Sequence, residues 1–262
     1  MTRPLSAAGS LVVIVVLFGL ASAQFGGQVV HVPAQDPEAT AAAQATLGEL
    51  CRAGHICTLV TVFDVQQQVV AGIKYYLGFA YAEHAPTGGR DIMGATAEVY
   101  VPFSGEPEVV TAARGNVSNA GIIMFSHAES AVMEYFGSLY SEVDISLETL
   151  TTSRAQRVSV DLKEFKGNGA FDMVRHNIIS FDGYFRCQAL CDQLPEGLAN
   201  ARSTFVVTED ESAGTYHYAA TLPLAIDDAY LSSVSIAVGM IGAALILAFL
   251  IAIGFVLKSA RV

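Results

Sequence analysis

The chain has 262 residues, of which 52% are hydrophobic and 15% are charged, and its formal net charge is -11. This acidic balance argues against nucleic acid as a partner, because phosphate groups would be repelled. Once two apolar end segments are set aside, about 210 residues remain, which is enough for one large domain or two small ones.

The first residues have the layout of a secretory signal peptide. Arg3 is followed by an apolar run over residues 11–20 and by the small residues Ala21-Ser22-Ala23, which are typical of a cleavage site. We therefore expect residues 1–23 to be removed and the mature chain to begin at Gln24. An uncleaved membrane anchor is the alternative, but the apolar run is short for a bilayer span.

Residues 36–50 are predicted to form a helix. Asp36 can cap its first turn, Pro37 suits the first helical position, and Glu38 complements the helix dipole. Small and apolar residues recur at helical spacing on one narrow face, namely Ala39, Ala43, Leu47 and Leu50. Such a face can lie close against a sheet, and Gly54 ends the segment.

Two strands follow, and the turn between them has an unusual composition. Apolar residues fall at every second position over residues 59–65 and 73–81, a period that is typical of strands. The turn contains Gln68-Val69-Val70-Ala71-Gly72, although turns that face water usually carry Gly, Asn, Asp or Ser. Residues 95–101 then alternate as a strand with one buried and one solvated face, and a fourth strand follows over 109–113.

One helix followed by an antiparallel meander predicts an α+β unit whose helix covers only one side of the sheet. Its residues resemble the cystatins, the inhibitors of papain-like cysteine proteases. Residues 68–72 fit the family's hairpin motif of Gln, any residue, Val, any residue, Gly. Gly26-Gly27 is similar to the family's N-terminal glycine, and Pro102-Phe103 stands where many members carry Pro-Trp. The chain has no tryptophan, and the resemblance covers only about residues 26–113.

The resemblance implies both a cystatin-like fold and a mode of action. In this family an N-terminal segment and two hairpin tips form a wedge that enters the protease cleft, which would explain an apolar tip. Phe25 would fill a substrate-side pocket, and the glycines would hold the backbone away from the catalytic thiol. The implied protease-binding residues are Phe25, Gly26, Gly27, Gln68, Val69, Val70, Ala71, Gly72, Pro102 and Phe103. Inhibition would be reversible and would need no cofactor, metal or catalytic residue.

The region from residue 120 to residue 230 is expected to form a second, β-rich domain beside the membrane, after a cystatin-like domain over residues 24–115. A helix is possible over 130–140, and strands are expected over 156–165, 177–189, 203–208 and 215–222. Asn116, followed by Val117-Ser118, fits an N-glycosylation acceptor.

A transmembrane helix is predicted over residues 234–257, which carry no charge and are long enough to cross about 30 Å of hydrocarbon. Lys258 and Arg261 follow it, so the positive-inside rule places the tail, residues 258–262, in the cytosol. A removable lipid-anchor signal is the weaker alternative because of those basic residues. We therefore expect a single-pass type I membrane protein with its ectodomain outside the cell or in a secretory or lysosomal lumen.

The four cysteines form two close pairs in an oxidising compartment, where three pairings are possible. We favour disulfides between Cys51 and Cys57 and between Cys187 and Cys191. A metal cluster that includes His55 is less favoured in a secreted chain.

No group of residues favours an enzyme. His127 and Glu129 lie in no motif that fixes a nucleophile, and the acidic residues 209–211 are interpreted as a solvated loop rather than a calcium site. Two hypotheses remain. The first is a membrane-anchored inhibitor of papain-like cysteine proteases, and the second is a non-inhibitory structural or recognition protein with a cystatin-like binding module. Exposure of the hairpin tips distinguishes them.

Overall fold

The computed structural model describes residues 29–34, 36–150, 155–165, 170–194, 198–199 and 201–223. The predicted signal peptide (1–23), the residues Phe25, Gly26 and Gly27, the predicted transmembrane helix (234–257) and the tail (258–262) lie outside these residues. Among the described residues, no helix is both long and apolar enough to cross a membrane.

The first of two sheets is formed by the N-terminal half of the described chain. Its five antiparallel strands lie in the order β1-β2-β3-β4-β5. They are β1 Val29–His31, β2 Ile56–Val69, β3 Gly72–His84, β4 Arg90–Pro102 and β5 Glu108–Arg114. The hairpin turn predicted from alternation therefore falls at Val70 and Ala71, between β2 and β3.

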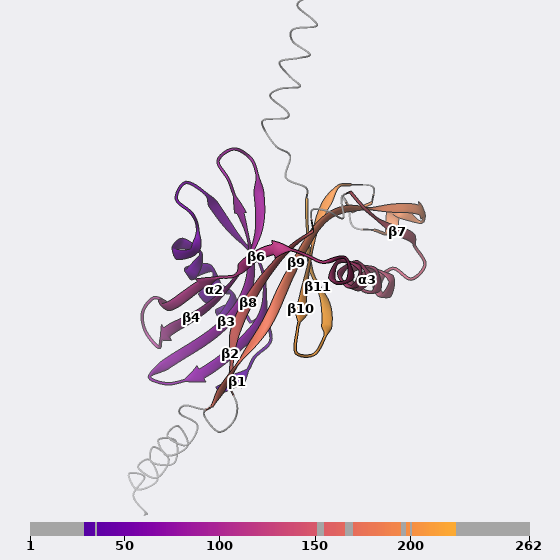
Figure 1. Ribbon diagram of the computed structural model, residues 1–262. Helices are drawn as coiled ribbons and strands as arrows, with labels where there is room; N and C mark the ends of the chain where they lie inside the picture. Colours follow the sequence, from indigo (N-terminus) through magenta and orange to yellow (C-terminus); the bar gives the residue numbers. More distant parts are fainter. Residues whose placement is uncertain are drawn as a thin grey trace, which may run out of the picture.

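The helix α2, Pro37–Leu50, packs on one face of this sheet (Figure 1). Asp36 caps it, since its side chain accepts hydrogen bonds from the backbone nitrogens of Glu38 and Ala39 at 2.9 Å each. The side chains that face the sheet are mostly small, so the helix backbone can approach the strands closely. They pack on a core that includes Val65, Tyr75, Leu77 and Phe79.

The second sheet is also antiparallel and has the order β11-β10-β9-β8-β6, while β7 pairs with β9. Its strands are β6 Asn116–Asn119, β7 Asp144–Thr149, β8 Gln156–Phe165, β9 Phe171–Ala189, β10 Ser203–Asp210 and β11 Thr215–Pro223. The helix α3, Ile122–Leu139, begins well before the predicted residue 130 and packs on this sheet through Phe125, Val132 and Phe136.

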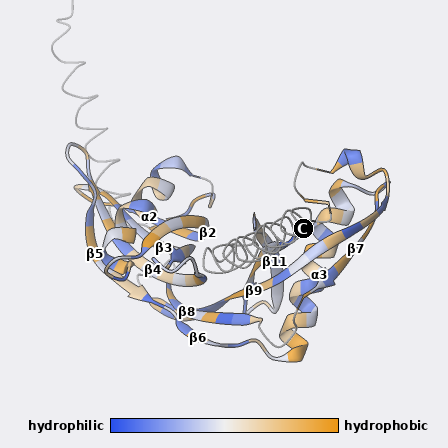
Figure 2. Cartoon of the chain, turned by 90° about the horizontal axis from the view of Figure 1, so that it is seen from above, coloured by the Kyte–Doolittle hydropathy of each residue, from blue (hydrophilic) through white to orange (hydrophobic). Residues whose placement is uncertain are grey.

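The two sheets pack face to face through a shared core. Ala80, Ala82 and Ile92 of the first sheet meet Val158, Val160, Ile178 and Val206 of the second. Successive side chains of a strand point to opposite faces of the sheet. Ile178 therefore lies in this shared core, whereas Ile179 packs in the core under α3. The layers therefore run α2, first sheet, second sheet, α3, and the two helices lie on opposite sides of the molecule (Figure 2).

The predicted fold class, a cystatin-like helix on an antiparallel sheet followed by a β-rich domain and a transmembrane helix, is wrong. The described chain is mostly antiparallel β-sheet, with α2 and α3 as its two α-helices and one short 3-10 helix, η2, at Cys191–Gln193. The prediction failed because one face of the first sheet was expected to be solvated. A second sheet covers that face, and β3 is therefore buried almost throughout. The division into residues 24–115 and 120–230 stays a prediction.

The chain passes from the first sheet to the second at Gly115, between β5 and β6. The backbone nitrogen of Gly115 donates to the carbonyl oxygen of Gly94 at 2.8 Å. A Cβ atom on Gly115 would lie 2.6 Å from the carbonyl oxygen of Ser159 and 2.7 Å from the side chain of Val158. Only glycine allows the strand to pass this close to β8.

Substitution of Gly115 by alanine should therefore destabilise the protein by about 1–3 kcal/mol, because the new methyl group meets a backbone atom that cannot rotate away. Gly48→Ala is the matched control, since nothing lies within 4 Å of the added Cβ atom in α2, and it should stabilise the protein by about 0.5–1 kcal/mol. Denaturant titration followed by circular dichroism measures both effects. Equal stabilities for the two variants would contradict the close packing at Gly115.

Candidate functional site

Two hairpin tips lie side by side at one end of the first sheet and expose apolar side chains. In the β2–β3 tip, Val69 and Val70 are 40% and 42% exposed, and in the β4–β5 tip Phe103 is 75% exposed. The register brings the tips together, because Gly72 of β3 lies directly opposite Pro102 of β4. We call Gln68–Gly72 together with Pro102-Phe103 the apolar edge.

Gly72 is required at its position because the strands are close there. A Cβ atom would lie 2.5 Å from the carbonyl oxygen of Val101 and 2.8 Å from the ring of Tyr100, and real Cβ atoms do not approach so closely. The hydroxyl of Tyr100 donates to the carbonyl oxygen of Ala71 at 3.0 Å. Tyr100 thus links the two tips, a role that the alternating pattern of residues 95–101 gave no reason to expect.

The N-terminal strand β1 lies next to the apolar edge. Val29, the first described residue, pairs with Gln68 at the end of β2. Gln68 also accepts a hydrogen bond from the hydroxyl of Tyr76 at 3.1 Å, which orients its amide. Phe25, Gly26 and Gly27, which were predicted to complete the wedge, lie outside the described residues.

The second sheet contacts the first away from these tips. The side-chain amide of the buried Gln66 donates to the carbonyl oxygen of Lys163 at 2.9 Å and accepts from the backbone nitrogen of Phe165 at 3.0 Å. The ring of Phe165 also packs against Tyr76, with 4.5 Å between the ring centroids. Val69, Val70 and Phe103 remain exposed with both sheets in place.

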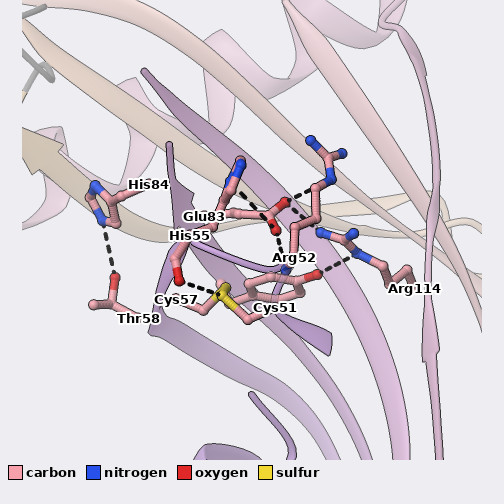
Figure 3. Close-up of a disulfide and its surroundings, with 9 residues drawn as sticks. Cys51, Arg52, His55, Cys57, Thr58, Glu83, His84 and Arg114 are labelled. Carbon is pink, nitrogen blue, oxygen red and sulfur yellow. Dashed lines mark hydrogen bonds and ion pairs between the residues drawn. A yellow bond between two sulfur atoms is a disulfide. The ribbon is translucent and has the colours of Figure 1, made fainter. Parts of the chain in front are cut away.

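Both expected disulfides are present, Cys51 with Cys57 and Cys187 with Cys191. The first closes the loop between α2 and β2 and lies beside the buried carboxylate of Glu83, as Figure 3 shows. The backbone nitrogen of Arg52 donates to Glu83 at 2.8 Å, and the guanidinium of Arg114 forms a hydrogen-bonded ion pair with it. This cluster ties the α2–β2 loop to β3 and β5.

Burial acts to raise the pKa of the Glu83 carboxyl, but the hydrogen bonds from Arg52 and Arg114 and their charges outweigh burial and lower this pKa from its ordinary value of 4.5. The Nδ1 atom of His55 lies 3.8 Å from the same carboxylate. The sulfur atoms of Cys51 and Cys57 and a carboxylate oxygen of Glu83 lie within 4.8 Å of one another. Because those sulfurs are bonded to each other, they offer no thiolate to a metal.

The other residues considered from the sequence have ordinary structural surroundings. The ring of His127 packs edge-to-face against Tyr216, with 5.2 Å between the centroids. Glu209 was expected in a solvated loop, but it is buried in β10 and accepts a hydrogen bond from the side chain of Asn177 at 2.6 Å. Asn116, the predicted glycosylation acceptor, is exposed at the start of β6.

The chain matches no protein-family model, and comparison with curated proteins finds no relative.

Replacement of Glu83 by Gln should destabilise the protein by about 2 kcal/mol at pH 7, because two guanidinium groups lose their buried anionic partner. Since the pKa of Glu83 is lower in the folded state, its contribution is fully present above about pH 4.5 and is lost as the pH falls through the folded-state pKa. The stability difference between Glu83→Gln and the original protein should therefore shrink in acid.

Asp161→Asn supplies the matched control for Glu83→Gln. Asp161 pairs with Arg175, but the two side chains are 46% and 51% exposed, so its loss should cost less than about 1 kcal/mol. Denaturant titrations between pH 3 and pH 8 test both variants, and a Glu83→Gln penalty that stays constant with pH would contradict the lowered pKa.

Proposed function

We propose that the protein is a reversible inhibitor of papain-like cysteine proteases and that the apolar edge enters the active-site cleft. The observation that carries the proposal is the exposure of Val69, Val70 and Phe103 on two tips held side by side by the Gly72–Pro102 pairing. Exposed apolar residues gathered at one place are typical of a surface that becomes buried in a partner.

The chemistry of the apolar edge suits a narrow apolar cleft. Burial of its valines and its phenylalanine removes apolar surface from water, at about 25 cal/mol for each Å². Its residues carry no charge, so no ion must be desolvated on binding. Gln68 adds a neutral amide that can form hydrogen bonds. Inhibition in this form is steric occlusion, which requires no covalent step and no catalytic residue.

The two tips are held in a fixed arrangement in the absence of a partner. The hydrogen bond from Tyr100 to Ala71 and the close approach at Gly72 fix the two tips relative to each other. Because little conformational entropy then has to be lost on association, a small contact area can give tight binding. Phe25, Gly26 and Gly27 belong to the proposed wedge through the resemblance alone.

The alternative function is that of a non-inhibitory recognition or structural module beside the membrane. That hypothesis expected the second half of the chain to cover the tips. The exposure of the tips supports the inhibitor.

Titration of papain with the protein tests the proposal directly. We expect reversible, competitive loss of activity against a small peptide substrate, with activity recovered on dilution. Papain that stays fully active at a saturating dose of folded protein would refute the function.

Substitution of Val70 by Asp should raise the inhibition constant about a hundred-fold, because an unpaired carboxylate would be forced into an apolar cleft. Ile56→Asp is the matched control. Ile56 is an exposed apolar residue, 69% accessible, at the opposite end of the same hairpin, and its replacement should leave inhibition unchanged. Steady-state inhibition assays compare the two variants, and equal losses would show that the apolar edge is not the contact surface.

A further inference from the structure

We propose that a second site, in the C-terminal half of the chain, binds a single acyl chain that ends in a carboxylate. A cavity of about 620 Å³ lies between the end of α3 and the ends of β10 and β11. This volume lies within the range typical of small-molecule sites. The inference is independent of the protease-binding proposal, because the cavity shares no residue with the apolar edge.

The cavity wall is made largely of aromatic and aliphatic side chains. Tyr135, Phe136, Leu139 and Tyr140 contribute from the end of α3, and Tyr218 contributes from β11. The rings of Tyr135 and Tyr218 stack with 4.3 Å between their centroids, and Phe136 meets Tyr218 edge-on at 5.1 Å. These contacts hold the wall in one arrangement, so an apolar ligand would find a surface that is already formed.

Part of this wall is left in contact with water. Tyr135 is 42% exposed and Leu139 is 56% exposed, although both border the cavity. The hydroxyl of Tyr218 already shares a hydrogen bond of 2.9 Å with Thr221, so this tyrosine presents mainly its ring. An acyl chain could cover these apolar surfaces without leaving that hydroxyl unpaired.

Arg202 supplies the charge that selects the head group. It is exposed and is the one charged residue among the described residues that line the cavity. Within the described part of the chain, no carboxylate forms an ion pair with it. In a protein whose net charge is -11, one free guanidinium beside an apolar cavity favours an amphiphile with an anionic head, and a carboxylate matches its paired N–H donors.

The size and charge of the cavity favour a free acid over a two-chain phospholipid. One cation and about 620 Å³ suit one head group and one chain.

Photolabelling of the full chain in phosphatidylcholine nanodiscs tests the site, with a diazirine derivative of dodecanoic acid as the probe. We expect adducts that mass spectrometry maps to residues 135–140 and 218–223. Unlabelled dodecanoate should compete, whereas dodecanol of the same length should compete at least ten-fold more weakly. From octanoate to dodecanoate, each added methylene should strengthen competition about four-fold.

Variants at Arg202 separate a binding role from a structural one. Arg202→Gln should weaken the competition by dodecanoate about ten-fold, and Arg202→Lys should retain most of it. Arg186→Gln is the control, because Arg186 lies on β9 outside the cavity and is 54% exposed. Thermal unfolding should be alike for all three variants.

Three results would overturn the proposal. The first is equal competition by dodecanoate and dodecanol, and the second is adducts found only in other parts of the chain. The third is labelling that is suppressed by phosphatidylserine in the discs but not by dodecanoate. Because the assay contains no protease, its outcome does not depend on whether papain is inhibited.

Discussion

The arrangement of the chain depends on the contact between its two sheets. Ala80 and Ala82 carry small side chains, so the sheets come close enough for Val158, Val160 and Ile178 to pack on them. The central strands of each sheet, such as β3 and β10, are therefore buried on both faces, with a helix on one side and the other sheet on the other. Apolar area enclosed in this way is the main source of stability in such a structure.

This packing leaves the end of the first sheet free for function. The second sheet meets β2 at Gln66 and β3 at Tyr76, and beyond these points the strands continue into the two tips. At the end of β3 away from the tips, the buried Glu83 connects the α2–β2 loop to β5 through its contacts with Arg52 and Arg114. The strands are thus fixed along their length while the tips stay exposed, as expected for a rigid element that carries a binding surface.

Local features could be predicted from the sequence, and contacts between distant segments could not. Asp36-Pro37 marked the start of α2, and close spacing indicated both cysteine pairs, because these signals act over a few residues. The packing of the second sheet on the first was not predicted. A signal for it was present, because the continuous apolar run Leu77–Ala82 is typical of a strand that is buried on both faces. The apolar composition of the tip at Val69 was visible in the sequence, but its pairing beside Phe103 required the register of β3 and β4.

The strand that crosses at Gly115 has a consequence for how the molecule folds. The strands β5 and β6 are edge strands of different sheets and are joined by one glycine. A displacement of one sheet would therefore also displace the edge strand of the other. Partial opening of either half would also separate Gly115 from Val158 and Ser159 of β8, against which it packs. The two halves are therefore expected to lose their structure together, as one cooperative unit, so damage far from the tips would still remove the surface that they present.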